Sequence, residues 1–422
     1  MSDSTMRSSR FSALRHPQFL RFWLASFSSV GATQLQIMGL GWLVYELSGS
    51  ALALGYLSGA SGLPAILTSL FGGALADRWD KRLLLIITCS LTALLLSLLT
   101  WLDFSGQATV WNVILIAGVI SVITGFDWPA RNAIFPYLIE REDMMSAVSL
   151  TTVIWQSTRM VMPALGGIII AVFDTWVLFA CCAAGFFAMC LVLTTLKVHR
   201  PVVDLSHVSS TLGQIAEGVR FIVTERTFLI LMTLSYSLFF FAGSYMQLMP
   251  AFADLLDVAE QGYGYLLSAG GMGAILGTVL SGSLQDSHRL GRAMLLSAAV
   301  ACGFVYLFAA VSWSGLPGAY FMALGSAFCA AVFISIFMIT STTVLQLEVP
   351  DRLRGRVMGL HTVTYNLATL GGLFSGAIAS FTHVSAAIAI AVTLFLVYLV
   401  WVMITQKDIR EIDGSQLTMR GS

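Results

Sequence analysis

Two charged residues inside apolar stretches are the first candidates for chemistry in this sequence. Asp127 and Arg159 each lie within a long hydrophobic run. An ionised side chain at membrane depth costs at least about 2.5 kcal/mol on insertion scales, so Arg159 needs a compensating partner. Asp127 could pair with Arg159 on the next segment, or with Arg131 one turn later on its own segment. Gln156 precedes Arg159 by three residues and shares its helical face. If Asp127 titrates in a cavity, it is the best candidate for a proton carrier.

A charged loop occurs twice in the chain. Residues 73–82, Gly-Ala-Leu-Ala-Asp-Arg-Trp-Asp-Lys-Arg, return in altered form at 282–292. Gly73 and Asp77 align with Gly282 and Asp286 at a single offset of 209 residues. A second pair of similar segments, 136–147 and 350–359, places proline and then charges before corresponding apolar runs. These repeats indicate two homologous halves, which is the common plan of secondary transporters.

The repeated loop predicts a gate. Asp77 falls at the C-terminal end of a helix, where the macrodipole disfavours a carboxylate by several tenths of a kcal/mol, so it should have an external partner. If the halves are pseudo-symmetric, that partner is the start of the eleventh span near 354–357, and Asp286 faces the start of the fifth span near Met144. Gly73 lies one turn before Asp77 and permits close approach of another backbone. The alternative for the basic residues is that they only orient the chain. The predicted gating set is Gly73, Asp77, Arg78, Lys81, Arg82, Gly282, Asp286, Arg292, Arg354 and Arg356.

The composition predicts an all-α membrane protein. Hydrophobic residues make up 57% and charged residues only 10% of the 422 residues, with mean hydropathy +0.84, whereas soluble domains are about 25% charged. A bilayer core needs roughly 20 apolar residues per helix. Twelve such spans are expected, at 19–47, 51–76, 83–102, 110–134, 145–173, 176–196, 228–252, 262–284, 293–313, 317–345, 357–381 and 384–404. The predicted organisation is a cytoplasmic arm (1–18), a six-helix bundle (19–196), a linker with an amphipathic helix (197–227), a second six-helix bundle (228–404) and a cytoplasmic tail (405–422).

The distribution of basic residues predicts the orientation, because Lys and Arg gather in cytoplasmic loops. With both termini inside, all 22 basic residues except Arg159 fall on the inner side, and Arg159 is the only one expected at membrane depth. The outer loops instead carry acidic residues: Glu46, Asp103, Asp174, Asp254, Asp257 and Glu260. We therefore expect a multi-pass protein of a bacterial-type inner (plasma) membrane with cytoplasmic N- and C-termini.

Three motifs resemble the major facilitator superfamily. Residues 73–82 are similar to its signature loop, with a glycine, an aspartate four residues later and a basic cluster. The segments 127–136 and 159–167 resemble the branch that contains the enterobactin exporter and macrolide efflux proteins. The resemblance covers nearly the whole chain and implies twelve helices in two pseudo-symmetric halves, alternating access, and export by proton antiport.

Two departures from the family pattern bear on coupling. Exporters of the superfamily often have glycine immediately before the proline of the fifth span, and this chain has Met162 before Pro163. Many proton-coupled drug exporters also carry a carboxylate in the first span, where this chain has Gln34 and Gln36. Symport therefore stays open as the alternative to antiport, and the coupling residue is undecided.

Polar and aromatic side chains within the spans predict a substrate cavity. In transporters the site lies near the bilayer midplane, between the repeats. For each residue alone, helix packing is an equally good interpretation. The predicted cavity set is Gln34, Gln36, Trp155, Gln156, Tyr236, Tyr245, Gln247, Tyr365 and Asn366. A cavity rich in aromatic and amide groups suits a bulky amphipathic organic molecule.

The sequence thus predicts a proton-coupled exporter of a hydrophobic or amphipathic small molecule, drug-like or siderophore-like. The alternative is an uptake symporter of a small organic solute; a membrane enzyme or non-transporting receptor is more remote. No phosphate-binding P-loop is present in the sequence. The six histidines are scattered, so no catalytic residue, metal or cofactor is expected. The expected partners are the substrate, protons and lipid, without nucleic acid, for a monomeric protein.

Overall fold

The computed structural model describes residues 11–78, 80–196, 211–284 and 289–413, and within these ranges the side chains of 69–78, 136, 211, 212 and 214 are excepted. All regular structure in this part of the chain is helical. The first half contains α1 (Pro17–Ser48), α2 (Ala51–Arg78), α3 (Lys81–Phe104), α4 (Val110–Ala133), α5 (Met144–Phe173) and α6 (Thr175–Thr195). The second contains α8 (Arg226–Ser237), α9 (Met249–Leu255), α10 (Glu260–Gly282), α11 (Leu290–Trp313), α12 (Ala319–Glu348), α13 (Asp351–Ala379) and α14 (Val384–Thr405). Shorter helices are Ser12–Arg15, Phe135–Tyr137, Arg141–Asp143, α7 (Thr211–Thr224) and α15 (Lys407–Arg410).

The long helices identify a multi-pass membrane protein. Ten helical segments of the described chain are long and apolar enough to cross a bilayer. The remaining two predicted spans correspond to α1 and α13, which have 32 and 29 residues but are more polar. The all-α fold is therefore confirmed, and ten of the twelve spans also meet the requirement for hydropathy.

The seventh span is not the single continuous helix expected over 228–252. After α8 the chain forms a π-helical segment, Leu238–Ala242, and a 3-10 segment, Gly243–Leu248, before α9 begins. Pro250 is one physical reason, because proline lacks a backbone N–H and starts a helix more readily than it continues one. Such irregular turns within helices often mark functional positions. The break contains Tyr245 and Gln247, two residues of the predicted cavity.

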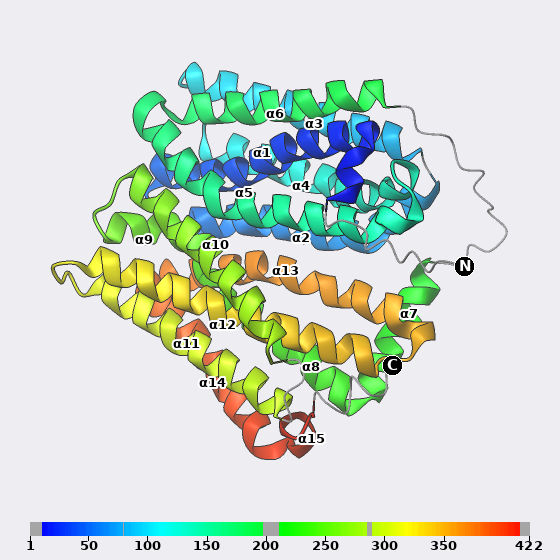
Figure 1. Ribbon diagram of the computed structural model, residues 1–422. Helices are drawn as coiled ribbons and strands as arrows, with labels where there is room; N and C mark the ends of the chain where they lie inside the picture. The colour runs from blue at the N-terminus through cyan, green and yellow to red at the C-terminus, as the bar shows by residue number, and fades with distance from the viewer. Residues whose placement is uncertain (1–10, 79, 197–210, 285–288, 414–422) are drawn as a thin grey trace, which may run out of the picture.

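The helices form two bundles, α1–α6 and α8–α14, that meet along two seams (Figure 1). One seam joins α2 to α13 and the other joins α5 to α10. Six crossings in each half put the starts of α1 and α8 and the ends of α6 and α14 at one end of the molecule, which we call the terminal end. The opposite end is the far end.

Glycines bring the backbones of the two halves into contact along both seams. A Cβ atom on Gly376 of α13 would lie 2.7 Å from the Ala51 carbonyl oxygen of α2. A Cβ atom on Gly271 of α10 would lie 2.7 Å from the Arg159 carbonyl oxygen of α5. Only residues without a side chain permit such an approach. These contacts lie between the middle of the helices and the far end.

The halves diverge toward the terminal end. Val153 precedes Met160 by seven residues, two helical turns, and therefore lies on the same face of α5. Met160 contacts α10 next to Gly271, yet Val153 is 56% exposed. The cleft between the bundles is thus closed at the far end and open at the terminal end.

Candidate functional site

Asp127 pairs with Arg131 inside the first bundle. Arg131 Nε donates to Asp127 Oδ2 at 3.0 Å, and Arg131 is only 4% exposed. Its Nη1 also donates to the hydroxyls of Ser26 and Ser29 on α1, at 3.3 and 3.2 Å. The Thr88 hydroxyl of α3 donates to Asp127 Oδ1 at 3.1 Å. Of the two pairings left open by the sequence, the structure has the one with Arg131.

Arg159 has no such partner. No hydrogen bond or ion pair to its guanidinium occurs within the described chain. The expectation that Arg159 is the only buried basic residue was wrong, because Arg159 is half-buried whereas Arg131 and Lys81 are buried. Tyr245 and Tyr365 of the second half are close enough to interact with it electrostatically. The Tyr245 side chain is 1% exposed, and its hydroxyl has no hydrogen-bond partner among the described residues. Arg159 therefore lies near two tyrosines of the other half.

A pocket lies beside Arg159, between the terminal-end parts of α4 and α5. Its volume is about 480 Å³. The indole rings of Trp128 and Trp155 form one wall, with centroids 5.9 Å apart and planes inclined by 53°. The lining residues are Trp128, Asn132, Phe135, Met144, Val148, Thr151, Thr152, Trp155 and Gln156. The pocket thus combines two indoles with two amides.

The pocket opens toward the cleft. On α4, Gly125 contacts Thr68 of α2, and Arg131 contacts α1. Trp128 lies three residues after Gly125 and three before Arg131. At 3.6 residues per turn its side chain therefore points between α1 and α2. The apolar residues Leu115, Val119 and Val122 are exposed on the opposite side of α4. They provide the lipid-facing surface, and Trp128 faces inward.

The predicted cavity residues lie in different parts of the structure. Trp155 and Gln156 line the pocket, while Tyr245 and Tyr365 flank Arg159. The Tyr236 hydroxyl donates to the Leu360 carbonyl at 2.8 Å and packs within the second half. Gln247, in the 3-10 segment, accepts a hydrogen bond from Ser58 of α2 at 3.5 Å. Gln34 and Asn366 are half-buried, and Gln36 is buried with an Oε1 that has no partner among the described residues.

Sequence reasoning missed Trp128 and Asn132. Both lie in the segment 127–136 that had been singled out as a motif, one residue after Asp127 and one after Arg131. Their spacing of four places them on one helical face, adjacent to the face of the ion pair. That spacing was the available signal.

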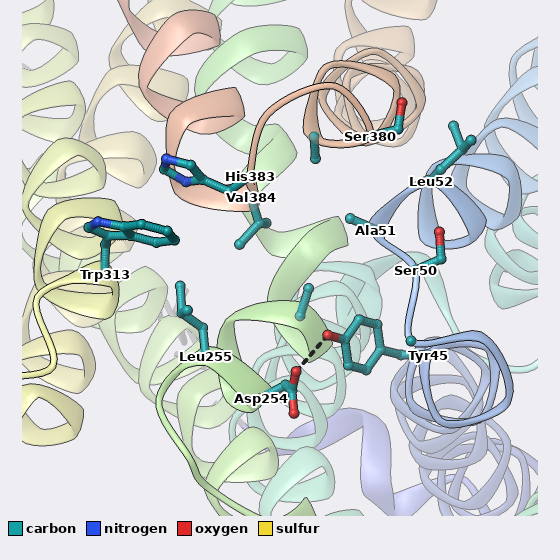
Figure 2. Close-up of a pocket in the computed structure, with 13 residues that line it drawn as sticks. Tyr45, Ser50, Ala51, Leu52, Asp254, Leu255, Trp313, Ser380, His383 and Val384 are labelled. Atoms are coloured by element: carbon teal, nitrogen blue, oxygen red, sulfur yellow. Dashed lines mark hydrogen bonds between the residues drawn. The ribbon is translucent and has the colours of Figure 1, made fainter.

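The far end is sealed by aromatic and polar contacts between the halves. The Tyr45 hydroxyl of α1 donates to Asp254 Oδ2 of α9 at 2.8 Å (Figure 2). Trp42 of α1 stacks on Tyr263 of α10, with ring centroids 5.6 Å apart. Tyr45 and Asp254 also line a cavity of about 320 Å³, together with Trp313. The sequence did not predict these contacts.

At the terminal end, the basic residues expected to form the gate have other partners. Arg354 pairs with Asp351 at 2.6 Å, and Arg356 pairs with Glu217 of α7. Arg82 donates to the carbonyl oxygens of Leu193 and Thr194 at the end of α6. Lys81 is buried, whereas Gly282 and Arg292 are exposed.

The other half of the gate prediction lies outside the described residues. Nothing is described of the side chains of Gly73, Asp77 and Arg78 or of Asp286. Their contacts with α13 and α5 stay predictions. The linker contains a helix, α7, in which Ile222 is buried while Val219 and Val223 are exposed; its expected position on the membrane surface stays a prediction.

Comparisons with known proteins support one family. The profile of the family described as transmembrane secretion effector matches residues 8–420. The chain is 26% identical to the enterobactin exporter EntS of Shigella flexneri over 371 residues, covering 85% of each protein. It is also 26% identical to the enterobactin exporter EntS of Escherichia coli O6:K15:H31 over 419 residues, covering 96% of each.

Solved structures with this fold include other transporters. The nucleoside transporter NupG aligns with a TM-score of 0.74 at 16% identity, covering 92% of this chain and 99% of that one. A bacterial homologue of the iron transporter ferroportin, in an inward-facing state, aligns with a TM-score of 0.69 at 14% identity, covering 91% and 98%. At this level of identity the likeness concerns the fold.

Proposed function

Because the chain belongs to the transmembrane secretion effector family of major facilitator superfamily transporters, we propose that it exports an amphipathic small organic molecule across the inner membrane. The family makes it a transporter and not an enzyme. The enterobactin exporters that it resembles favour a siderophore-like cargo over other drug-like molecules.

The observation that carries the proposal is the cleft between the halves. Its wall at the terminal end offers the indoles of Trp128 and Trp155 and the amides of Asn132 and Gln156. Such surfaces bind largely apolar ligands that carry a few polar groups. Basic residues concentrate at the terminal end, so that end is assigned to the cytoplasm. The cleft then receives cargo from the cytoplasm, and one chain supplies both halves of the path, so a monomer suffices.

Asp127 is the proposed proton carrier. Within the described chain it is the only carboxylate that lies more than one turn from the end of a membrane-spanning helix. Its carboxylate is held by Arg131 and Thr88. Protonation would remove the negative charge and release Arg131, which also contacts α1, so proton binding is linked to the packing of α4 against α1.

Inverted membrane vesicles test the direction and the energy source. Respiration acidifies the vesicle lumen, so a proton-coupled exporter should accumulate isotopically labelled enterobactin or erythromycin there, and a protonophore should abolish the accumulation. An uptake symporter would instead release preloaded compound. No proton-driven accumulation of either compound would overturn the proposal.

The variant Asp127→Asn tests the proton carrier. We expect it to lose proton-driven accumulation by at least tenfold while retaining exchange of labelled for unlabelled compound, which requires no net proton movement. Asp257→Asn is the matched control, because Asp257 is exposed in a far-end loop. Proton-driven accumulation by Asp127→Asn at the wild-type rate would exclude this role.

A further inference from the structure

Arg159 presents an unsatisfied cationic hydrogen-bond donor beside the boundary between the halves. Its half-buried guanidinium has no hydrogen-bond or ion-pair partner among the described residues, and Tyr245 and Tyr365 of the second half are close enough to interact with it electrostatically. A charged donor without a partner is unfavourable away from bulk water. A ligand that brings an anionic oxygen would satisfy the guanidinium.

The indole pocket and Arg159 lie along one face of α5. Trp155 and Gln156 line the pocket and precede Arg159 by four and three residues, so all three are neighbours on the helix surface. Val148 and Thr152 continue the same stripe toward the terminal end. An aromatic ring between Trp128 and Trp155 therefore lies about one helical turn from the guanidinium.

From this juxtaposition we propose that the pocket between α4 and α5 binds a planar aromatic group whose acidic oxygen, a carboxylate or phenolate, pairs with Arg159. The inclined indoles of Trp128 and Trp155 contact the ring, since offset and edge-to-face aromatic rings attract one another. Guanidinium groups bind planar oxyanions with two parallel hydrogen bonds.

The inference deepens the proposed function and rests on it, since it names the chemical class of the cargo. A neutral aromatic compound would leave the guanidinium unsatisfied, so the site should discriminate by charge.

Binding of 2-naphthoate and of its neutral analogue 2-naphthamide tests the proposal. Isothermal titration calorimetry uses the full-length protein in lipid nanodiscs. We expect the wild type to bind naphthoate at least tenfold more tightly than naphthamide. Arg159→Gln should weaken naphthoate binding at least tenfold and naphthamide binding less than twofold, while Arg159→Lys should retain part of the preference.

Trp128→Ala separates the effect of the aromatic contact from that of the charge. It should lower the binding affinity for both probes by a similar factor, at least fivefold. Matched controls are Arg226→Gln, at the exposed start of α8, and Trp101→Ala, on the exposed face of α3. Both should leave the two affinities unchanged. Circular dichroism and gel filtration verify folding of each variant.

Three results would overturn the proposal: no saturable binding of naphthoate, equal wild-type affinity for the two probes, or unchanged affinity in folded Arg159→Gln. Transport assays distinguish failure of this site assignment from failure of the proposed export function. If vesicles accumulate enterobactin or erythromycin but naphthoate neither binds nor inhibits, the site assignment fails and export stands. If naphthoate binds as expected and no proton-driven accumulation occurs, export fails and the site stands.

Discussion

Replacing Gly376 by alanine should favour opening of the far end. In the present structure a Cβ atom on Gly376 would lie 2.7 Å from the Ala51 carbonyl oxygen and 2.9 Å from the Gly55 Cα. Ordinary contact begins at 3.4 Å, and both atoms belong to the backbone of α2, so a side-chain rotation cannot relieve the overlap. The helices must separate, and overpacking of this kind costs typically about 1–3 kcal/mol.

The free-energy cost of the overlap applies only to the conformation in which the far end is closed. The α2–α13 contact joins the two halves and must break when the far end opens, so alanine destabilises the closed state and leaves the open state unaffected. A penalty of about 1–3 kcal/mol shifts the equilibrium toward the open far end by about 5- to 150-fold. Any gain from the higher helix propensity of alanine, up to about 1 kcal/mol, is common to both states.

Electron–electron double resonance between spin labels measures this shift. Labels at Gln107 and Leu316, which are exposed in far-end loops of different halves, report the separation of the bundles in a cysteine-free background. Gly376→Ala should increase the population at the longer distance. The control is Gly303→Ala, because no heavy atom lies within 4 Å of a Cβ at Gly303. A folded Gly376→Ala protein with the distance distribution of the control would refute the reasoning.

Two further substitutions test contacts seen in the structure. Tyr45→Phe removes the 2.8 Å hydrogen bond to Asp254 and should favour the open far end by about 0.5–1.5 kcal/mol in the same spin-label experiment, whereas Tyr56→Phe, at an exposed position, should have no effect. Asp127→Asn and Arg131→Met should each lower the free energy of unfolding in detergent by about 3–5 kcal/mol, because each leaves a buried partner unpaired. The double variant should be less destabilised than the sum of the two by about 1–3 kcal/mol, and additive effects would show that the pair is not coupled.

The separation of the halves illustrates why some of the site was beyond sequence reasoning. Trp155, Gln156, Tyr245 and Tyr365 could be selected as polar or aromatic residues within apolar spans, and the structure brings all four close to Arg159. Tyr236 satisfied the same criterion but packs within its own half. The spacing and polarity of residues in the sequence indicate which side chains share a face of a helix. They do not identify the helix that packs against that face.

Membrane helices, the duplication and the asymmetry of basic residues follow from the sequence alone. Hydropathy is a sum over neighbouring residues, and a repeat is visible at a fixed offset, so neither depends on long-range contacts. The tertiary structure decided three other matters: the pairing of Asp127 with Arg131, the break in the seventh span, and the unpaired position of Arg159 beside an indole pocket. Each depends on how distant helices rotate and approach one another, because a buried charge is compensated by whichever polar group packing brings within hydrogen-bond distance.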